Sequence, residues 1–299
     1  MSSIKNVALI GASGSLGTVI LKKLQDAGDF NIKVLRRNGS TATFSSNVHV
    51  EDVDYESVEA LTAALKGQDA VVSAIGTMQI LPQKKVIDAA VAAGVKRFLP
   101  SEYGCNLAHP KARKLPVFQM KVEIEDYLIE QSKTSDITYT FVYNNSFLDW
   151  GLQYDFILKV SDYKPVIYND GEQIFSATSL PTIADAVVGV LHHPEETKNR
   201  PIYIKDVDIS QHQLLALAKK AAPEKPWEPS YVKLDDVIAK SNERLAQGLF
   251  DFETFVPYIY QAIFDPSYEG RFIKTDNELL GLKGKTDEEL FEIVKQYVK

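Results

Sequence analysis

The stretch Val7-Ala8-Leu9-Ile10-Gly11-Ala12-Ser13-Gly14-Ser15-Leu16-Gly17 decides the fold of this chain. Its first four residues form a short apolar run, which is typical of a strand buried on both faces. Three glycines follow at the spacing G-x-x-G-x-x-G. Apolar residues then recur at helical spacing up to Gly28, a typical C-terminal glycine of a helix. A glycine turn between a buried strand and an amphipathic helix predicts a dinucleotide-binding βα unit.

Each glycine of this turn has a physical role in such a unit. Gly11 is expected to make the tight turn, Gly14 to let the backbone approach a pyrophosphate, and Gly17 to let the helix pack on the strand. The backbone N–H groups of the helix start are expected to point at the phosphates, where the helix dipole favours an anion. These groups belong to Ser13, Gly14, Ser15 and Leu16. The alternative is a helix-entry turn with incidental glycines, and the flanking strand and helix argue against it.

Short apolar strands and amphipathic helices keep alternating to about residue 145. Further strands are expected at 32–35, 48–53, 70–72, 97–99 and 137–142. Further helices are expected at 58–65, 86–93 and 118–130. This alternation predicts an α/β fold, a Rossmann-type doubly wound parallel sheet with right-handed crossovers.

After residue 145 aromatic residues become frequent and the alternation loosens. A helix at 183–191, a strand at 201–204 and a helix at 210–221 still follow the earlier pattern. We therefore expect a dinucleotide-binding domain at 1–145, to which 181–221 returns. A smaller α/β substrate-binding lobe is expected from 146–180 and 222–299, packed on the carboxyl edge of the sheet, where ligands bind in such folds. Thr286 and Glu289 predict a capping box at the start of the last helix.

The end of the second strand distinguishes the two nicotinamide cofactors. An NAD site has a carboxylate about 20 residues after the glycine turn, where it binds the ribose 2′-hydroxyl. This chain has Arg36 and Arg37 there, with no acid alongside in the sequence. Paired guanidinium groups suit a 2′-phosphate because each is planar, positively charged and carries several hydrogen-bond donors. The pair favours NADP(H) over NAD, and solvated surface charge is the alternative.

Composition excludes several other classes of function. The chain has 299 residues, a net charge of −7 and no run of Lys or Arg, so nucleic acid is not an expected partner. No signal peptide or membrane-spanning run is visible, and the single cysteine fits a reducing compartment, so a cytoplasmic protein without a membrane partner is expected. The histidines have no metal-ligand spacing, so no metal is expected. Cys105 with His109 lacks a third group to complete a nucleophilic site.

The catalytic pair usual in short-chain dehydrogenases, Tyr-x-x-x-Lys, is absent. None of the 14 tyrosines has a lysine four residues later. Proton transfer by a lysine-activated phenol is therefore not expected.

Several ordered motifs resemble one family. They are V-V-S-A-I-G at 71–76, Gln79, Gln83, G-V-K-R-F-L-P-S-E-Y-G at 94–104, V-F-Q-M-K at 117–121, and T-F-V with N-S-F at 140–147. Together they resemble the isoflavone-reductase-like, NmrA-like family, an atypical branch of the short-chain dehydrogenases/reductases. This family includes isoflavone and pinoresinol–lariciresinol reductases. The resemblance covers most of 4–150, is fair at 180–220 and fades after 225; Tyr103 stands where the family usually has Phe.

The resemblance implies an NADPH-dependent oxidoreductase that transfers hydride to an electrophilic carbon of an aromatic or heterocyclic small molecule. Lys121 would be the catalytic residue. Its ammonium group would stabilise negative charge on the substrate oxygen or donate a proton to it. A surface lysine on a helix is the alternative.

The resemblance also implies the remaining site residues. Ala74, Ile75 and Gly76 at a strand end would bind the cofactor, as would Phe147 beside the nicotinamide. Asn145 would orient its loop or the cofactor amide. The substrate would meet residues from two loops, namely Tyr103, Phe147 and Trp150. Tyr103 is a second candidate proton donor. Glu102 is expected to cap its loop, and a role as an acid or base is the alternative.

A regulator of the NmrA-like kind, which senses the dinucleotide without turnover, is the alternative function. The presence of both Lys121 and Arg36 favours the enzyme, because a sensor needs Arg36 to bind the cofactor but does not need a catalytic lysine. The sequence leaves open the substrate, the bond reduced, the stereochemistry and the oligomeric state.

Overall fold

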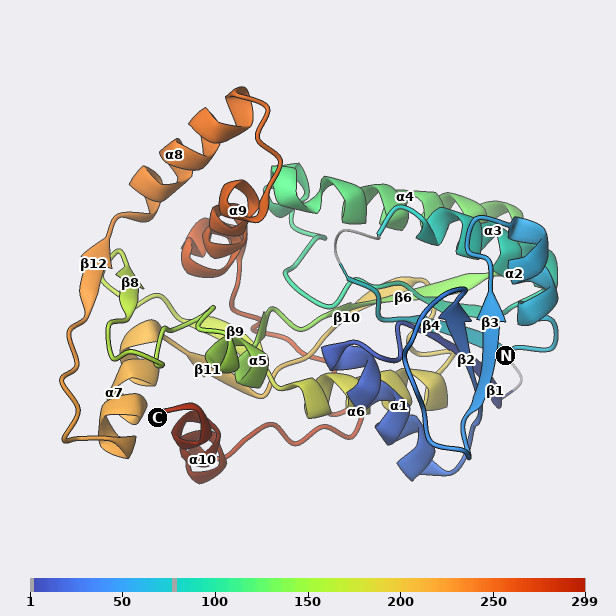
Figure 1. The fold of residues 1–299 in the computed structure, drawn as a ribbon, viewed down its shortest axis with the longest axis horizontal. Helices are drawn as coiled ribbons and strands as arrows, with labels where there is room; N and C mark the ends of the chain where they lie inside the picture. Colours follow the sequence, from blue (N-terminus) through green and yellow to red (C-terminus); the bar gives the residue numbers. More distant parts are fainter. Residues whose placement is uncertain (1–2, 77–79, 299) are drawn as a thin grey trace.

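A computed structural model describes residues 3–76 and 80–298 (Figure 1). Seven parallel strands form its central sheet, in the order β10-β6-β5-β4-β1-β2-β3. In chain order they are β1 (Asn6–Ile10), β2 (Asn31–Arg37), β3 (His49–Val53), β4 (Ala70–Ser73), β5 (Arg97–Leu99), β6 (Thr138–Tyr143) and β10 (Arg200–Tyr203). The predicted doubly wound Rossmann-type sheet is confirmed.

The sheet is buried on both faces, which explains its continuous apolar strands. In β1, Val7 and Leu9 point into one buried apolar cluster, and Ala8 and Ile10 point into the other. Helices cover both sides (Figure 1). On one side lie α2 (Val58–Leu65), α3 (Gln83–Ala93) and α4 (Gln119–Thr134); on the other lie α1 (Ser15–Ala27) and α6 (Leu180–His192). Gly28 ends α1 with a φ of 72°, as the sequence predicts.

The strand order reverses between β1 and β4. The chain goes from β1 outward to β2 and β3, and then returns to the other side of β1 to form β4, β5 and β6. In such sheets a crevice opens between the carboxyl ends of the strands at this switch point. The fold therefore places the turn after β1 and the loops after β4, β5 and β6 at one edge.

The remaining elements gather beside the sheet, on the left of Figure 1. A three-stranded sheet has the order β11-β9-β7, and a two-stranded sheet joins β12 to β8. The strands are β7 (Ser146–Phe147), β8 (Val166–Tyr168), β9 (Phe175–Thr178), β11 (Val207–Ile209) and β12 (Ser230–Val232). The helices are α5 (Leu148–Gln153), α7 (Gln211–Ala221), α8 (Leu234–Ala246), α9 (Phe252–Phe264) and α10 (Asp287–Tyr297).

The second half differs in detail from the expectations. Helix α7, expected with the large sheet, packs against α10 and β8. Helix α8 was not expected, because Pro223, Pro226 and Pro229 predicted an irregular link there; only Leu234, Ile238 and Ser241 of its 13 residues are buried. The capping box of Thr286 and Glu289 is confirmed. The division into a domain at 1–145 with 181–221 and a lobe at 146–180 with 222–299 stays a prediction.

Among the described residues, no helix combines the length and the apolar character needed to cross a membrane.

Candidate functional site

The turn after β1 is shaped by close approach to the end of β4. Gly11 has a φ of +79°, and an added Cβ would lie 2.4 Å from the carbonyl oxygen of Ala74. A Cβ on Gly17 would lie 2.0 Å from the carbonyl oxygen of Gly11. Backbone atoms cannot yield as a flexible side chain can, so the tight turn and the helix packing both require glycine at these positions.

Gly14 differs from the other two glycines. A Cβ on it would meet no atom of the described chain closer than 3.5 Å, so packing within the protein does not require glycine there. Gly14 is the N-cap of α1 and supplies no side-chain cap, and Ser13 and Ser15 beside it are exposed. The first N–H groups of a helix lack partners within the helix. The turn therefore offers a bare anion-binding surface that a pyrophosphate can approach closely.

A cavity of about 280 Å³ lies beside this turn. Of the predicted residues, its lining includes Gly11, Ser13, Arg36, Arg37 and Ile75. The predicted residues outside its lining are 14–17, Ala74, Gly76, Tyr103, Lys121, Asn145, Phe147 and Trp150. Other residues of the lining, which were not predicted to belong to the site, include Ser40, Phe44, Tyr55, Glu56, Pro82 and Gln83. No motif in the sequence marks these residues, except that Gln83 belongs to the family resemblance. The only further sign of a binding site there is that aromatic residues, Phe44 and Tyr55, flank β3.

The two arginines at the end of β2 have different surroundings. Arg36 lies opposite Asp52 of β3 and donates from Nε and Nη2 to its two carboxylate oxygens, at 2.6 and 2.8 Å. Its Nη1 donates to the carbonyl oxygen of Ala42 at 2.6 Å. The side-chain hydrogen bonds raise the pKa of Arg36 and lower that of Asp52. The sequence shows no acid beside the pair, but the sheet register supplies one.

Arg37 is exposed, and its guanidinium makes no hydrogen bond or ion pair with the described part of the chain. It lines the same cavity as Arg36. Arg37 is therefore the arginine whose donors are all available to a phosphate.

The segment after β4 is fixed from two sides. The backbone N–H of Ala74 donates to Ile10 at 2.9 Å, and the hydroxyl of Ser101 donates to the carbonyl oxygen of Ile75 at 2.7 Å. Gly76 has open space where a Cβ would lie. Gln79, part of the family resemblance, lies outside the described residues.

Lys121 lies in the first turn of α4 and contacts the loop after β5. Its Nζ donates to the main-chain carbonyl oxygen of Glu102, and a Cβ added to Gly104 would lie 3.5 Å from that Nζ. The carbonyl oxygen of Gly104 accepts from the backbone N–H groups of Asn144 and Asn145, at 3.1 and 2.9 Å. The loops after β5 and β6 and the start of α4 therefore meet at Lys121.

Two buried carboxyl groups lie near this lysine. Glu102 is 1% exposed, and burial raises its pKa to about 8, against the opposing effect of Lys121. Glu125 accepts from the hydroxyl of Tyr143 and from Arg113, both at 2.6 Å, and burial raises its pKa as well. Glu102 is thus a buried acid, which a loop-capping role does not explain.

Tyr103 is 7% exposed, and its hydroxyl oxygen has no hydrogen-bond partner in the described chain. Burial raises the pKa of this phenol. Tyr103 packs on the apolar cluster that also contains Ala12 and Leu16 of the glycine turn. The half-buried rings of Phe147 and Trp150 pack on the same cluster, edge to face with centroids 6.2 Å apart. Tyr103, Phe147 and Trp150 therefore belong to one large apolar cluster, within which Phe147 and Trp150 contact each other; their role as substrate residues stays a prediction.

Asn145 connects the loop after β6 to the distant segment that follows α9. It adopts a left-handed backbone with a φ of 52°, which asparagine tolerates better than most residues. Its Nδ2 donates to the carbonyl oxygen of Gly270 at 2.5 Å. A Cβ on Gly270 would lie 2.9 Å from the carbonyl oxygens of Ala262 and Ile263. Asn145 therefore connects this loop to the segment after α9, and its role towards the cofactor stays a prediction.

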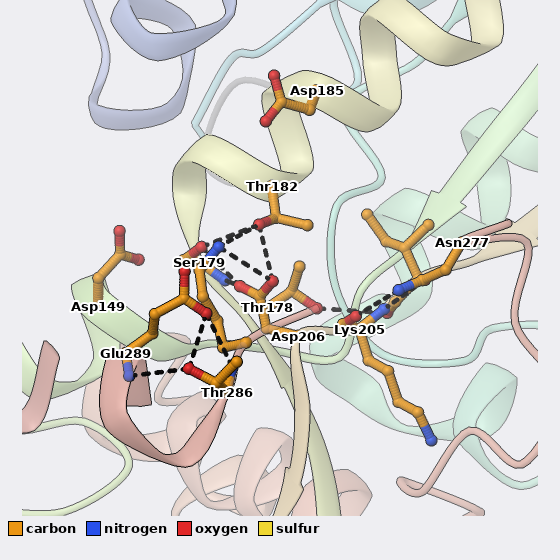
Figure 2. A network of polar contacts seen from close by, with 12 residues as sticks. Asp149, Thr178, Ser179, Thr182, Asp185, Lys205, Asp206, Asn277, Thr286 and Glu289 are labelled. Carbon is orange, nitrogen blue, oxygen red and sulfur yellow. Dashed lines mark hydrogen bonds and ion pairs between the residues drawn. The ribbon is translucent and has the colours of Figure 1, made fainter. Parts of the chain in front are cut away.

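A buried polar network supports the same loop (Figure 2). Asp206 accepts from the N–H and hydroxyl of Ser179, at 2.7 and 2.6 Å, and from the hydroxyl of Thr182 at 2.8 Å. The neighbouring Thr178 donates from its hydroxyl to the carbonyl oxygen of Asn144 at 2.7 Å. These bonds fix the start of α6 and the backbone beside the predicted nicotinamide position.

Polar atoms without partners gather at the ends of β4, β5 and β6. Within the described residues, the buried atoms there that lack a hydrogen bond are Ser73 Oγ, Glu102 Oε2, Tyr103 Oη, Asn144 Oδ1, Asn145 Oδ1 and Ser146 Oγ. Buried polar groups in proteins nearly always have partners. This cluster therefore fits a ligand rich in hydroxyl and amide groups, as a dinucleotide is.

Comparisons with known proteins agree with this geometry. The model of the NmrA-like family matches residues 3–256. The chain is 34% identical to "Oxidoreductase aprR" of Aspergillus flavus over 97% of this chain and 98% of the relative. It is 26% identical to "Phenylcoumaran benzylic ether reductase PT1" of Pinus taeda over 80% and 81%. A solved structure described as "AtPrR2 with NADP+ and (+)pinoresinol" shares the fold over 100% of both chains, with a TM-score of 0.79 and 22% identity.

Proposed function

The chain belongs to the NmrA-like family, and we propose that it is an NADPH-dependent oxidoreductase that transfers hydride to an electrophilic carbon of an aromatic or heterocyclic small molecule. The match to the family model and to the phenylcoumaran benzylic ether reductase of Pinus taeda confirms the resemblance seen in the sequence. The observation that carries the proposal is the position of Lys121, whose Nζ lies against the loop at the carboxyl end of β5, which is itself hydrogen-bonded to the loop after β6.

The cofactor-binding role rests on the turn and the cavity. The bare helix start at 13–16 would hold the pyrophosphate, and Arg37 with Arg36 would hold the 2′-phosphate. The strand end at 74–76 would border the dinucleotide, and the unpartnered oxygens of Asn144 and Asn145 would receive donors from the nicotinamide half. NADPH, when bound, supplies a hydride from the nicotinamide ring.

Lys121 would act on the substrate oxygen. Its Nζ uses one donor on Glu102, which leaves two for a substrate oxygen that gains negative charge. Phe147 and Trp150 pack edge to face and would supply apolar ring surface to a flat substrate. The related proteins support an aromatic substrate class, since one structure is described with (+)pinoresinol.

An acceptor screen tests this function. Purified protein is mixed with NADPH and a panel of aromatic enones, imines, quinones and benzylic ethers, and the loss of NADPH absorbance and the reduced product are measured. We expect saturable turnover with at least one member and none with Lys121→Ala. Saturable NADPH binding with no oxidation by any acceptor would instead identify a dinucleotide-sensing regulator.

A further inference from the structure

Three polar side chains from distant segments meet on the surface of the elements beside the large sheet. His212 is the second residue of α7, Glu172 lies in the turn between β8 and β9, and Tyr231 is the middle residue of β12. The Nδ1 atom of His212 lies 2.6 Å from Oε1 of Glu172, and its Nε2 atom lies 3.2 Å from the hydroxyl oxygen of Tyr231. The imidazole therefore joins a carboxylate to a phenol through both of its ring nitrogens.

Contacts with the turn after β8 fix the position of this imidazole. The backbone N–H of His212 donates to the carbonyl oxygen of Gly171 at 3.1 Å. A Cβ added to Gly171 would lie 2.8 and 2.9 Å from Cδ2 and Nε2 of the His212 ring. The ring of Tyr231 meets the imidazole edge to face, with centroids 5.9 Å apart. Glycine at position 171 thus leaves the space that the imidazole occupies.

The carboxylate decides which ring nitrogen carries the proton. An ionised carboxylate accepts hydrogen bonds and cannot donate, so Nδ1 of His212 is the N–H that donates to Glu172. In the neutral imidazole Nε2 then has a lone pair, which accepts from the hydroxyl of Tyr231. A hydroxyl group bound to a base, with a third group orienting that base, is the arrangement that activates nucleophiles in proteins.

We propose that Tyr231 is a nucleophilic site that accepts an acyl group from activated esters, with His212 as its base and Glu172 as a positioning residue. The phenolic oxygen attacks the carbonyl carbon of the ester and forms a new C–O bond, and Nε2 of His212 takes the phenolic proton. The bond to the leaving oxygen then breaks, and its electron pair leaves with that oxygen. The proton passes from Nε2 to the leaving group or to water. The products are O-acyl-tyrosine and the alcohol or its anion, and no electron is gained or lost.

This site is separate from the proposed hydride transfer. The elements α7, β8 and β12 lie at one end of the molecule, whereas β1 and β2 lie at the other (Figure 1). None of the three side chains lines the cavity beside the glycine turn. Tyr231 is 56% exposed, so a small ester reaches it from solvent. Acylation is therefore expected to proceed in the absence of NADPH.

Reaction of the purified protein with p-nitrophenyl acetate tests the proposal. Tyr154 is the matched control within the same chain, since it is 57% exposed and its ring packs on Trp150 instead of a histidine. Peptide mapping by mass spectrometry is expected to show acetylation of Tyr231 about tenfold or more faster than that of Tyr154, because a positioned base accelerates the attack. Equal rates at the two tyrosines in the wild-type protein overturn the proposal.

Tyr231→Phe keeps the ring and removes the nucleophile. This variant is expected to lose the rapid phase of nitrophenolate release while its Tm and its Kd for NADPH stay unchanged. A rapid phase of full amplitude in Tyr231→Phe would place the reactive group elsewhere and overturns the proposal.

Two further substitutions distinguish a base from a structural contact. His212→Ala is expected to slow the acetylation of Tyr231 to the rate at Tyr154, and added imidazole is expected to restore part of the rate. Glu172→Ala is expected to slow it several-fold, whereas Glu172→Gln, whose amide oxygen still accepts from Nδ1, is expected to stay within about twofold of wild type. An unchanged rate in His212→Ala overturns the role of the base, and an unchanged rate in Glu172→Ala overturns the positioning role.

Discussion

Arg36 and Asp52 face each other on adjacent strands, and two hydrogen bonds of 2.6 and 2.8 Å join the guanidinium to the carboxylate. The pair lies at the edge of the cavity beside the glycine turn, whereas the neighbouring Arg37 keeps its donors unpaired among the described residues. The two arginines therefore contribute differently to a 2′-phosphate site.

Arg37→Ala is expected to weaken NADPH binding by about tenfold to hundredfold, because charge-assisted hydrogen bonds are worth about 1.5–3 kcal/mol. Binding of NADH, which lacks the 2′-phosphate, is expected to stay within about twofold. Arg36→Ala is also expected to weaken NADPH more than NADH. Calorimetric titration with both cofactors measures the effects. Equal losses for NADPH and NADH in either variant would contradict the 2′-phosphate assignment.

Asp52→Asn is expected to tighten NADPH binding a few-fold. The variant removes a negative charge from beside the phosphate and frees at least one donor of Arg36. The lost ion pair costs little, because solvent screens an exposed pair. Asp54→Asn, at the next exposed acid along the chain, is the control and should change nothing. Weaker NADPH binding in Asp52→Asn would show that the carboxylate is needed to orient Arg36.

Lys121→Ala is expected to lower kcat by about a hundredfold or more while leaving the Kd for NADPH unchanged, because a positioned proton donor contributes about that factor. Lys133→Ala removes an exposed lysine from the last turn of the same helix and serves as the control. Stopped-flow absorbance and fluorescence titration separate the two quantities. Undiminished turnover in Lys121→Ala would show that Lys121 is a surface lysine of α4 and not a catalytic residue.

Gly14→Ala and Gly17→Ala are expected to have opposite effects. A methyl group at position 17 meets the carbonyl oxygen of Gly11, so Gly17→Ala should lower Tm by several degrees. A methyl group at position 14 fits within the chain but occupies the space needed by a pyrophosphate, so Gly14→Ala should keep its Tm and lose cofactor affinity. Differential scanning fluorimetry with and without NADPH distinguishes them. A Gly14→Ala protein with normal affinity would place the pyrophosphate elsewhere.

Glu102→Gln is expected to change how stability depends on pH. The pKa of Glu102 is raised on folding, so the folded state favours the protonated acid. Its contribution to stability is complete at acidic pH and is lost as the pH rises towards about 8. The Tm of Glu102→Gln relative to wild type should therefore increase between pH 5 and about pH 8. Glu224→Gln, at an exposed loop acid, is the control; parallel Tm curves would mean that Glu102 titrates normally.

Local pattern predicted most of the sheet and the turn. The strands and helices up to residue 145 could be predicted from periodicity and from the glycines that end them, because both signals lie in residues that are close together in the sequence. Lys121 came only from the family resemblance. The sequence around it gives no sign that its Nζ reaches Glu102, which lies 19 residues away.

Contacts between distant segments could not be predicted. Asp52 reaches Arg36 through the register of two strands, and Asn145 reaches Gly270 across 125 residues. Neither contact leaves a local signature. Helix α8 was missed because the prolines before it indicate an irregular link, and because few of its residues are buried; it packs mainly against α9.

The bond from Asn145 to Gly270 uses a main-chain oxygen as its acceptor. Any residue presents such an oxygen, and the requirement for glycine at 270 comes from crowding by the end of α9. The side chains on either side of Gly270 are consequently not bound by this tether. Substitutions there can therefore alter the neighbouring surface while the bond from Asn145 to the main chain is kept.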